Sequence, residues 1–365
     1  MNMKAHCASL YRVCRGVSEF RSATSSTLKA CAAALLLLTV AQSSAATAAE
    51  SVNLDLPPRL QWGGNYGYCG EVSFVAAGLY FGQYISQYDA RALATDGIDQ
   101  SREDSQLLLD ENEGTAAEAM RLEAEIWSGG TTEAFLLWIK RNLMRGAPVL
   151  IGVFENTSVF DIHYANYDNI EDYTYDHIVP VTGYVSRRAL SDAEIHPDDE
   201  IQFSDNGDLK QNGKPKFQFA YPVARFLANR EEQSLLGGQP YFLGTRQNDG
   251  IAITGVQDRH GDTLPVRIAV DLPNEPEIED GSNARPAPVP LSLMITVSGL
   301  EAGVDYILYR YSDFDVVPTE DFNANSGGAD SATSIQIASG DSYTLNETIM
   351  SDDIAIYRAV RASAP

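Results

Sequence analysis

The stretch that decides the fold is QWGGNYGYCGEVSFVAA, residues 61–77. Its first half is rich in glycine and predicts turns, whereas its second half predicts a helix, because Val72, Val75 and Leu79 recur at helical spacing. Cys69 stands where the turn enters this helix. A helix N-terminus favours negative charge and so stabilises a thiolate, and the glycines let backbone N–H groups face a developing oxyanion. The stretch therefore predicts a reactive cysteine at a helix start.

The first 48 residues have the layout of a secretory signal. Five basic residues stand against one acid, and they are followed by an apolar run over 30–40 and a series of small residues that ends Ala46-Thr47-Ala48. The apolar run is too short for a transmembrane span. We expect residues 1–48 to be a signal peptide and the mature chain to be secreted or extracytoplasmic. Because the basic region is long, an organelle transit peptide is the alternative.

Three of the four cysteines lie in this leader, so Cys69 is the only thiol of the predicted mature chain. An internal disulfide is thereby excluded for that chain. A single thiol in an oxidising compartment is a chemical liability, which favours a functional cysteine; a buried, inert cysteine is the alternative interpretation.

The chain has 365 residues and a formal net charge of −24, which becomes −28 when the leader is removed. Such an acidic surface disfavours binding to nucleic acid or to anionic membranes. We therefore expect a peptide or protein substrate, no nucleic acid partner and no stable membrane insertion. A group of acids between 156 and 176 lacks the fixed spacing of a calcium-binding hand, so a solvated loop is preferred and neither a metal nor a cofactor is expected. These acids are Asp161, Asp168, Glu171, Asp172 and Asp176.

The order of predicted elements indicates an α+β fold over residues 49–250. Helices are predicted first, at 114–127 and 131–145, with a shorter helical segment at 221–229. Strands are predicted at 149–154, from His177 to 185, and at 201–204. Residues 251–365 are instead expected to form a small all-β sandwich, and the phrase SGLEAGVDYILYRY resembles fibronectin type III modules. The strands of that part are predicted at 251–256, 266–270, 291–297 and 306–311, with a linker over 271–290.

A cysteine nucleophile needs a base, and the base needs an acceptor that orients it. His177 stands at the mouth of an apolar strand, where its side chain is held rigidly, and Asp205 stands at the end of the next strand. Two adjacent strand ends can bring an imidazole and a carboxylate together. The other histidines of the mature chain are His163 in a tyrosine-rich loop, His196 in an acidic loop and His260 in a polar turn.

The sequence resembles the papain-like cysteine peptidases over about residues 60–230, most closely the subset that processes bacteriocin leaders. That subset has a Cys-Gly dipeptide opening a helix, then strands of the form G-x-P-V-x-I-G-V and H-x-V-x-V-x-G-Y. This chain has Cys69-Gly70, then GAPVLIGV at 146–153 and HIVPVTGY at 177–184. The resemblance implies that Cys69 is the nucleophile, His177 the base and Asp205 the orienting acid, with Asn206 as an alternative to Asp205.

The resemblance also implies a glutamine that donates to the oxyanion, usually about six residues before the cysteine. Gln61 lies eight residues before Cys69 and is the candidate, with Asn65 or the backbone as alternatives. The expected activity is that of a cysteine-type peptidase, a thiol hydrolase of peptide or isopeptide bonds. Transglutaminase-like acyl transfer is an alternative, as is a non-catalytic binding protein on a degenerate peptidase scaffold.

Overall fold

The computed structural model describes residues 49–156, 159, 175–207, 210–211, 214–227, 239–244, 247–271 and 277–362. Contacts divide the chain into residues 1–47 and 48–365, and the described residues belong to the second unit. The expected signal peptide therefore lies outside the described residues, as does most of the acidic, tyrosine-rich loop with His163. None of the helices in the described ranges is long and apolar enough to span a membrane.

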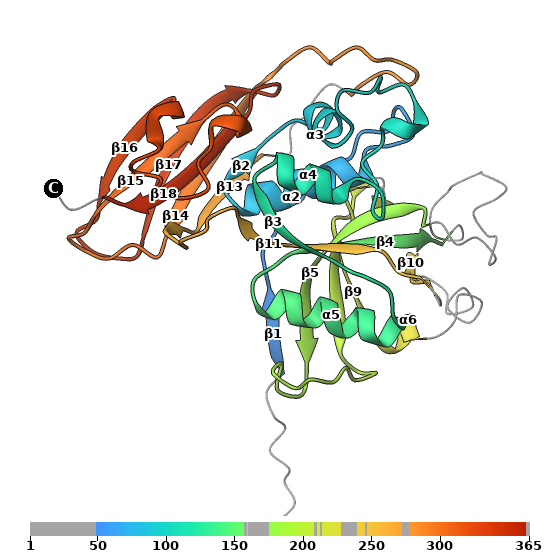
Figure 1. The fold of residues 1–365 in the computed structure, drawn as a ribbon. Coiled ribbons are helices and arrows are strands. Elements are labelled where there is room, and N and C mark those ends of the chain that lie inside the picture. Colours follow the sequence, from blue (N-terminus) through green and yellow to red (C-terminus); the bar gives the residue numbers. More distant parts are fainter. Residues whose placement is uncertain are drawn as a thin grey trace, which may run out of the picture. The chain divides into compact units, whose positions relative to one another are not determined.

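The fold is mixed and rich in sheet, and its described strand pairs are all antiparallel (Figure 1). This confirms the coarse expectation of helices combined with antiparallel sheets. The helices are α2 (Cys69–Tyr80), α3 (Gln87–Ala94), α4 (Glu113–Ala119), α5 (Thr132–Met144) and α6 (Ala224–Leu227). Short 3-10 turns lie at η1 (Glu103–Ser105), η2 (Phe314–Val316) and η3 (Ser326–Gly328).

The largest sheet has eight strands, in the order β3-β11-β4-β5-β6-β9, with β1 paired to β5 and β10 to β4. Its strands are β1 (Glu50–Asn53), β3 (Leu122–Ile126), β4 (Val149–Glu155), β5 (His177–Ser186), β6 (Glu200–Ser204), β9 (Gln218–Pro222), β10 (Tyr241–Phe242) and β11 (Gly250–Val256). The predicted strands at 149–154, from His177 and at 201–204 are thus confirmed. A separate two-stranded ribbon joins β7 (Lys210–Gln211) and β8 (Lys214–Pro215).

Helix α2 contributes side chains to both buried clusters that meet at β5, whereas α5 contributes to one of them. Ile178 of β5 belongs to the same buried cluster as Phe74 and Val75 of α2. Val179, the next residue of β5, belongs to a second cluster with Phe135 of α5. This alternation follows from the pleat, which directs successive side chains to opposite faces. A strand buried on both faces reads as a continuous apolar run, as HIVPV does.

Two smaller antiparallel sheets form the C-terminal part. One pairs the strands in the order β12-β18-β15-β16, with β2 added to β18, and the other in the order β13-β14-β17. Their bounds are β2 (Gln83–Tyr84), β12 (Thr263–Leu264), β13 (Val266–Val270), β14 (Pro290–Ser298), β15 (Asp305–Tyr311), β16 (Ser331–Gln336), β17 (Ser342–Met350) and β18 (Ala355–Arg361). This architecture is compatible with the expected small sandwich.

The single helix predicted over 114–127 is wrong. Helix α4 ends at Ala119, and Leu122–Ile126 form strand β3, which pairs with β11. Arg121 adopts a left-handed φ of 54° between the two elements, which breaks the helix. The residues of β3 are good helix formers, so tertiary pairing has overridden local propensity here.

Strand β11 was expected among the C-terminal strands, and this expectation is also wrong. β11 pairs with β3 and β4 inside the eight-stranded sheet. The sheet therefore continues past residue 250, where the sequence suggested a change of domain. The predicted helix at 221–229 is shorter than expected, because Tyr221 and Pro222 complete β9 and only Ala224–Leu227 are helical among the described residues.

Candidate active site

Cys69 is the first residue of α2, as the sequence predicts. Its thiol is not in a disulfide and its side chain is partly buried. The backbone N–H groups of the first helical turn surround this position, and such groups favour a nearby negative charge. Gly70 follows because the helix start is packed tightly: a Cβ on Gly70 would lie 2.0 Å from the Leu107 carbonyl oxygen.

His177 is the first residue of β5 and is almost fully buried. Its main chain pairs with Val153 of β4, and its ring lies 5.9 Å from the ring of Tyr241, measured between centroids. The start of the strand and this aromatic neighbour both restrict the imidazole. The sequence placed the histidine at this strand start, but Tyr241 carried no signal in the sequence.

Asp205 follows the last residue of β6 and is fully buried. Val181 of β5 pairs with Phe203 of β6. Because the two strands are antiparallel, the start of β5, where His177 stands, and the end of β6, which Asp205 follows, lie at the same edge of the sheet. The predicted base and its predicted orienting acid therefore belong to one corner of the sheet.

Asn206 joins the elements that carry these residues. Its Nδ2 donates to the Ile178 carbonyl at 2.9 Å, to Ser73 Oγ at 3.0 Å and, more weakly, to the Cys69 carbonyl at 3.4 Å. Ser73 Oγ in turn donates to the Cys69 carbonyl at 2.7 Å. Asn206 has a φ of +59°, a left-handed conformation that asparagine tolerates better than most residues. Its Nδ2 thus links the start of α2 to the start of β5, while its Oδ1 is buried with no hydrogen-bond partner among the described residues, so Asn206 stays an alternative to Asp205.

Gln61 lies beside the same turn. Its backbone N–H donates to the Asn206 carbonyl at 2.9 Å. Its side-chain nitrogen would be 3.3 Å from a Cβ on Gly67, two residues before Cys69. Its Oε1 is buried and has no hydrogen-bond partner among the described residues. A glutamine amide is therefore present next to the turn that leads into Cys69.

Asn65, the alternative to Gln61, is fully buried and its amide is committed elsewhere. Nδ2 donates to the Ser282 carbonyl at 2.6 Å and Oδ1 accepts from the Gly281 N–H at 2.7 Å. An amide held at both ends in this way is not positioned to donate to an oxyanion. The sequence left Asn65 open because residues 281–282 are too distant along the chain to be anticipated.

Tyr175 lies near Cys69 and packs against strand β4. Burial raises the pKa of the Tyr175 hydroxyl, and negative charge on Cys69 raises it further. The hydroxyl accepts from the Leu109 N–H at 2.7 Å and donates to the Leu109 carbonyl at 3.2 Å. The ring lies against Gly152, where a Cβ would come within 2.6 Å of it. Because Gly152 of the GAPVLIGV strand has no side chain, the Tyr175 ring can occupy the space above it; we call this space the Tyr175 slot.

A buried ion pair supports the turn before Cys69. Arg91 of α3 and Glu71 of α2 are both almost fully buried, with Nε and Oε1 2.5 Å apart. The guanidinium carbon also lies 3.6 Å from the centroid of the Tyr68 ring. Sequence reasoning missed this pair. The sequence indicates this pair only through one acidic residue and one basic residue, Glu71 and Arg91, in the two helices that follow the glycine-rich turn.

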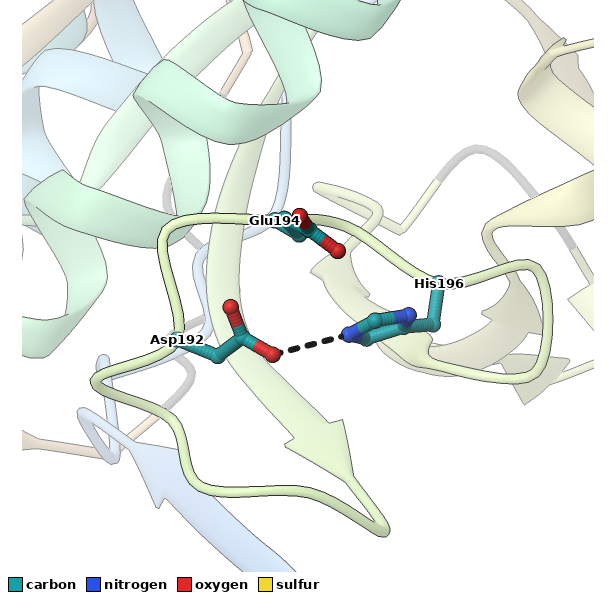
Figure 2. Close-up of side chains that lie close together, drawn as sticks. All are labelled: Asp192, Glu194 and His196. Atoms are coloured by element: carbon teal, nitrogen blue, oxygen red, sulfur yellow. Dashed lines mark hydrogen bonds and ion pairs between the residues drawn. The ribbon is translucent and has the colours of Figure 1, made fainter.

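A second group of ionisable side chains lies in the loop after β5, at the far end of that strand from His177 (Figure 2). Asp192, Glu194 and His196 present ligand atoms within 4.8 Å of one another. The His196 Nε2 is hydrogen-bonded to Asp192 Oδ2 at 3.2 Å, and this bond lowers the pKa of the Asp192 carboxyl. The His196 side chain is 16% exposed.

None of the protein-family models, curated proteins or solved structures compared with this chain matches it. The chain is therefore not assigned to a family by similarity. A function for the chain therefore rests on the geometry and chemistry of the site residues.

Proposed function

We propose that this chain is a secreted thiol hydrolase that cleaves peptide or isopeptide bonds, with a papain-like arrangement of its catalytic residues. Cys69 is the nucleophile, His177 the general base and acid, and Asp205 the acceptor that orients the imidazole. Gln61 is the side-chain donor to the oxyanion. A cysteine at the start of a helix that packs against an antiparallel sheet supports the resemblance to papain-like peptidases.

One observation carries the proposal. The amide of Asn206 bonds to main-chain or side-chain oxygens of Cys69, Ser73 and Ile178. Asn206 adjoins Asp205, and Ile178 adjoins His177. Residues separated by more than 100 positions are therefore linked at one point through direct hydrogen bonds. A lone inert cysteine does not require the start of its helix to be fastened beside a buried histidine and a buried aspartate.

The proposed chemistry proceeds in two steps. His177 takes the proton of the Cys69 thiol, the sulfur attacks the carbonyl carbon of the scissile amide, and the carbonyl oxygen becomes an oxyanion that Gln61 and backbone N–H groups stabilise. The carbon–nitrogen bond then breaks, and His177 gives its proton to the departing amine. Water, deprotonated by His177, cleaves the resulting thioester, which releases the acid and restores the thiol. An amine in place of water gives acyl transfer by the same route.

The first test is the alkylation rate of Cys69 by iodoacetamide as a function of pH, on the purified chain without its leader. A cysteine that forms an ion pair with a histidine is a thiolate well below the ordinary thiol pKa of about 8.5. We expect fast alkylation extending below pH 7, and we expect His177→Ala to abolish this low-pH reaction.

A rate that rises only near pH 8.5, or no reaction without denaturant, would overturn the proposal and leave the non-catalytic binding protein as the interpretation to pursue. His260→Ala is the matched control, because His260 lies in an exposed turn near Asp262 and Asp321. It should leave the pH profile unchanged.

A further inference from the structure

The backbone turn before Cys69 is left-handed at three successive residues. The φ angles are +49° at Asn65, +67° at Tyr66 and +84° at Gly67. Non-glycine residues visit this conformation singly, and a bulky side chain such as tyrosine disfavours it strongly. Such a turn persists only where its surroundings hold it in place, and strained turns of this kind are concentrated at functional sites.

Part of the support comes from nearby in the sequence. Arg91 Nη1 donates to the Asn65 carbonyl at 3.0 Å, and Nη2 donates to the Gly67 carbonyl. Gln106 Nε2 donates to the Tyr66 carbonyl at 3.0 Å. All three carbonyl groups of the left-handed residues therefore have side-chain donors.

The rest of the support comes from residues 277–285, more than 200 positions away, which we call the latch. Asp280 Oδ1 accepts from the Asn65 N–H at 2.9 Å. The main chain of Gly281 and Ser282 bonds to both ends of the Asn65 amide, at 2.7 and 2.6 Å. The latch thus satisfies the backbone donor and the side chain of the first left-handed residue.

The latch is itself anchored to the same region. Ile278 is buried and forms a small apolar cluster with Trp62 and Tyr68. Its carbonyl oxygen comes so close to Gly64 that a Cβ there would lie 2.5 Å from it, and so only glycine fits.

The latch also contacts α3 and the loop after it. Tyr88 donates its hydroxyl to the Asn283 carbonyl at 3.1 Å, and Asn283 Oδ1 accepts from the Gln100 N–H at 2.8 Å. Arg285 forms an ion pair with Asp89. The latch therefore makes specific contacts with this region and is not simply a linker.

The other end of α2 is also held by the C-terminal part. Tyr84 and Gln83, just after α2, pair with Ala355 and Ile356 of β18. Arg358 Nη2 donates to Gln83 Oε1 at 2.8 Å. Residues beyond 277 consequently fix both ends of the helix that begins with Cys69.

We propose that the latch is a positioning element of the thiol site: Asp280 and the 281–282 main chain hold Asn65 left-handed, and this sets where the Cys69 sulfur stands relative to His177. The inference rests on the proposed function. It makes the C-terminal part a constituent of the catalytic unit instead of a spacer or a substrate-binding accessory.

Three full-length variants test this. Asp280→Ala removes the acceptor for the Asn65 N–H, Asp280→Asn keeps an acceptor oxygen, and Glu279→Ala removes the same charge from a neighbouring exposed residue. The readouts are the low-pH alkylation rate of Cys69 and hydrogen exchange of the peptide covering 62–68. We expect Asp280→Ala to slow low-pH alkylation on the order of tenfold, because small displacements of a reacting group are costly. Exchange in 62–68 should become faster.

Asp280→Asn and Glu279→Ala should both stay within about twofold of wild type on the same scale. The positioning role of the latch is contradicted if Asp280→Ala matches wild type in both readouts. It is also contradicted if Glu279→Ala reproduces the effect of Asp280→Ala, because loss of negative charge would then explain both. If the wild-type protein lacks the low-pH reaction altogether, the proposed function is contradicted. If the wild type reacts at low pH and Asp280→Ala reacts equally fast, only the role of the latch is contradicted.

Discussion

At the scale of single residues, Gly152 shows how a strand position serves the site. Every side chain of β4 is buried, and Gly152 leaves the space that the Tyr175 ring occupies beside Cys69. We predict that Gly152→Ala destabilises the protein by about 1–3 kcal/mol, because the added methyl group would overlap the Tyr175 ring. Chemical denaturation gives the free energy of unfolding.

The matched control for this substitution is Gly255→Ala in β11. There the nearest atom to an added Cβ is a Glu123 carboxylate oxygen at 4.0 Å. This variant should be within about 0.5 kcal/mol of wild type, as expected for an open position. Equal losses for the two variants would show that backbone freedom of glycine, and not the Tyr175 slot, determines the cost.

At the scale of elements, the pairing of α2 with α3 depends on Glu71 and Arg91. Glu71 Oε1 also accepts the Leu107 N–H at 3.0 Å, so its removal leaves the buried Arg91 charge without its counterion and the Leu107 N–H without this acceptor. We predict that Glu71→Ala lowers the free energy of unfolding by about 3–5 kcal/mol, the range for breaking one side of a buried ion pair.

The exposed pair Arg102–Asp104 offers the comparison, with side chains 62% and 57% exposed. Arg102→Ala should change the free energy of unfolding by less than about 1 kcal/mol, because water screens this pair. A small loss for Glu71→Ala, comparable to that of Arg102→Ala, would contradict the role assigned to the buried pair.

The element that sequence reasoning misassigned illustrates the limits of periodicity. Residues 122–126 (LEAEI) carry helix-forming side chains, and four of the five are exposed in β3. Nothing in this local pattern marks a strand. The strand exists because β11 offers a row of unpaired backbone groups, and β11 itself lies about 125 residues further along the chain.

At the scale of the whole molecule, buried tyrosines predict how the protein responds to alkali. Burial raises the pKa of Tyr68 and of Tyr311 to about 12, and burial also raises the pKa of Tyr175, Tyr184 and Tyr357. The unfolded chain loses these protons near the ordinary tyrosine pKa of 10.0, so above that pH the unfolded state binds fewer protons than the native state.

We therefore predict that stability is unaffected by these groups below pH 10 and falls progressively as the pH rises above it. Tyrosinate absorbance should increase in two phases, an early one from exposed tyrosines and a late one that coincides with the loss of circular dichroism. A single early phase, with all tyrosines titrating while the fold is intact, would contradict the burial described here.

The sequence by itself determined the local features of the site: a cysteine at a helix start, a histidine at a strand start and an aspartate after the next strand. Glycine content, helical spacing and apolar runs are properties of short segments, so they could be read without a structure. The start of α2 followed from them, as did the bounds of α5, β4, β5 and β6. Asn206, in contrast, was expected only as an alternative to Asp205, and the hydrogen bonds of its amide to Cys69, Ser73 and Ile178 carried no signal in the sequence.

Only the tertiary structure decided which distant groups meet. The latch on Asn65, the slot of Gly152 for Tyr175, and the pairing of β2 with β18 all join residues whose local sequence gives no sign of a partner. The physical reason is that hydrogen bonds and close packing depend on positions in space, and chain folding brings together segments whose separation in sequence carries no record of it. The membership of β11 in the large sheet was hidden for the same reason, since its partners β3 and β4 lie far upstream.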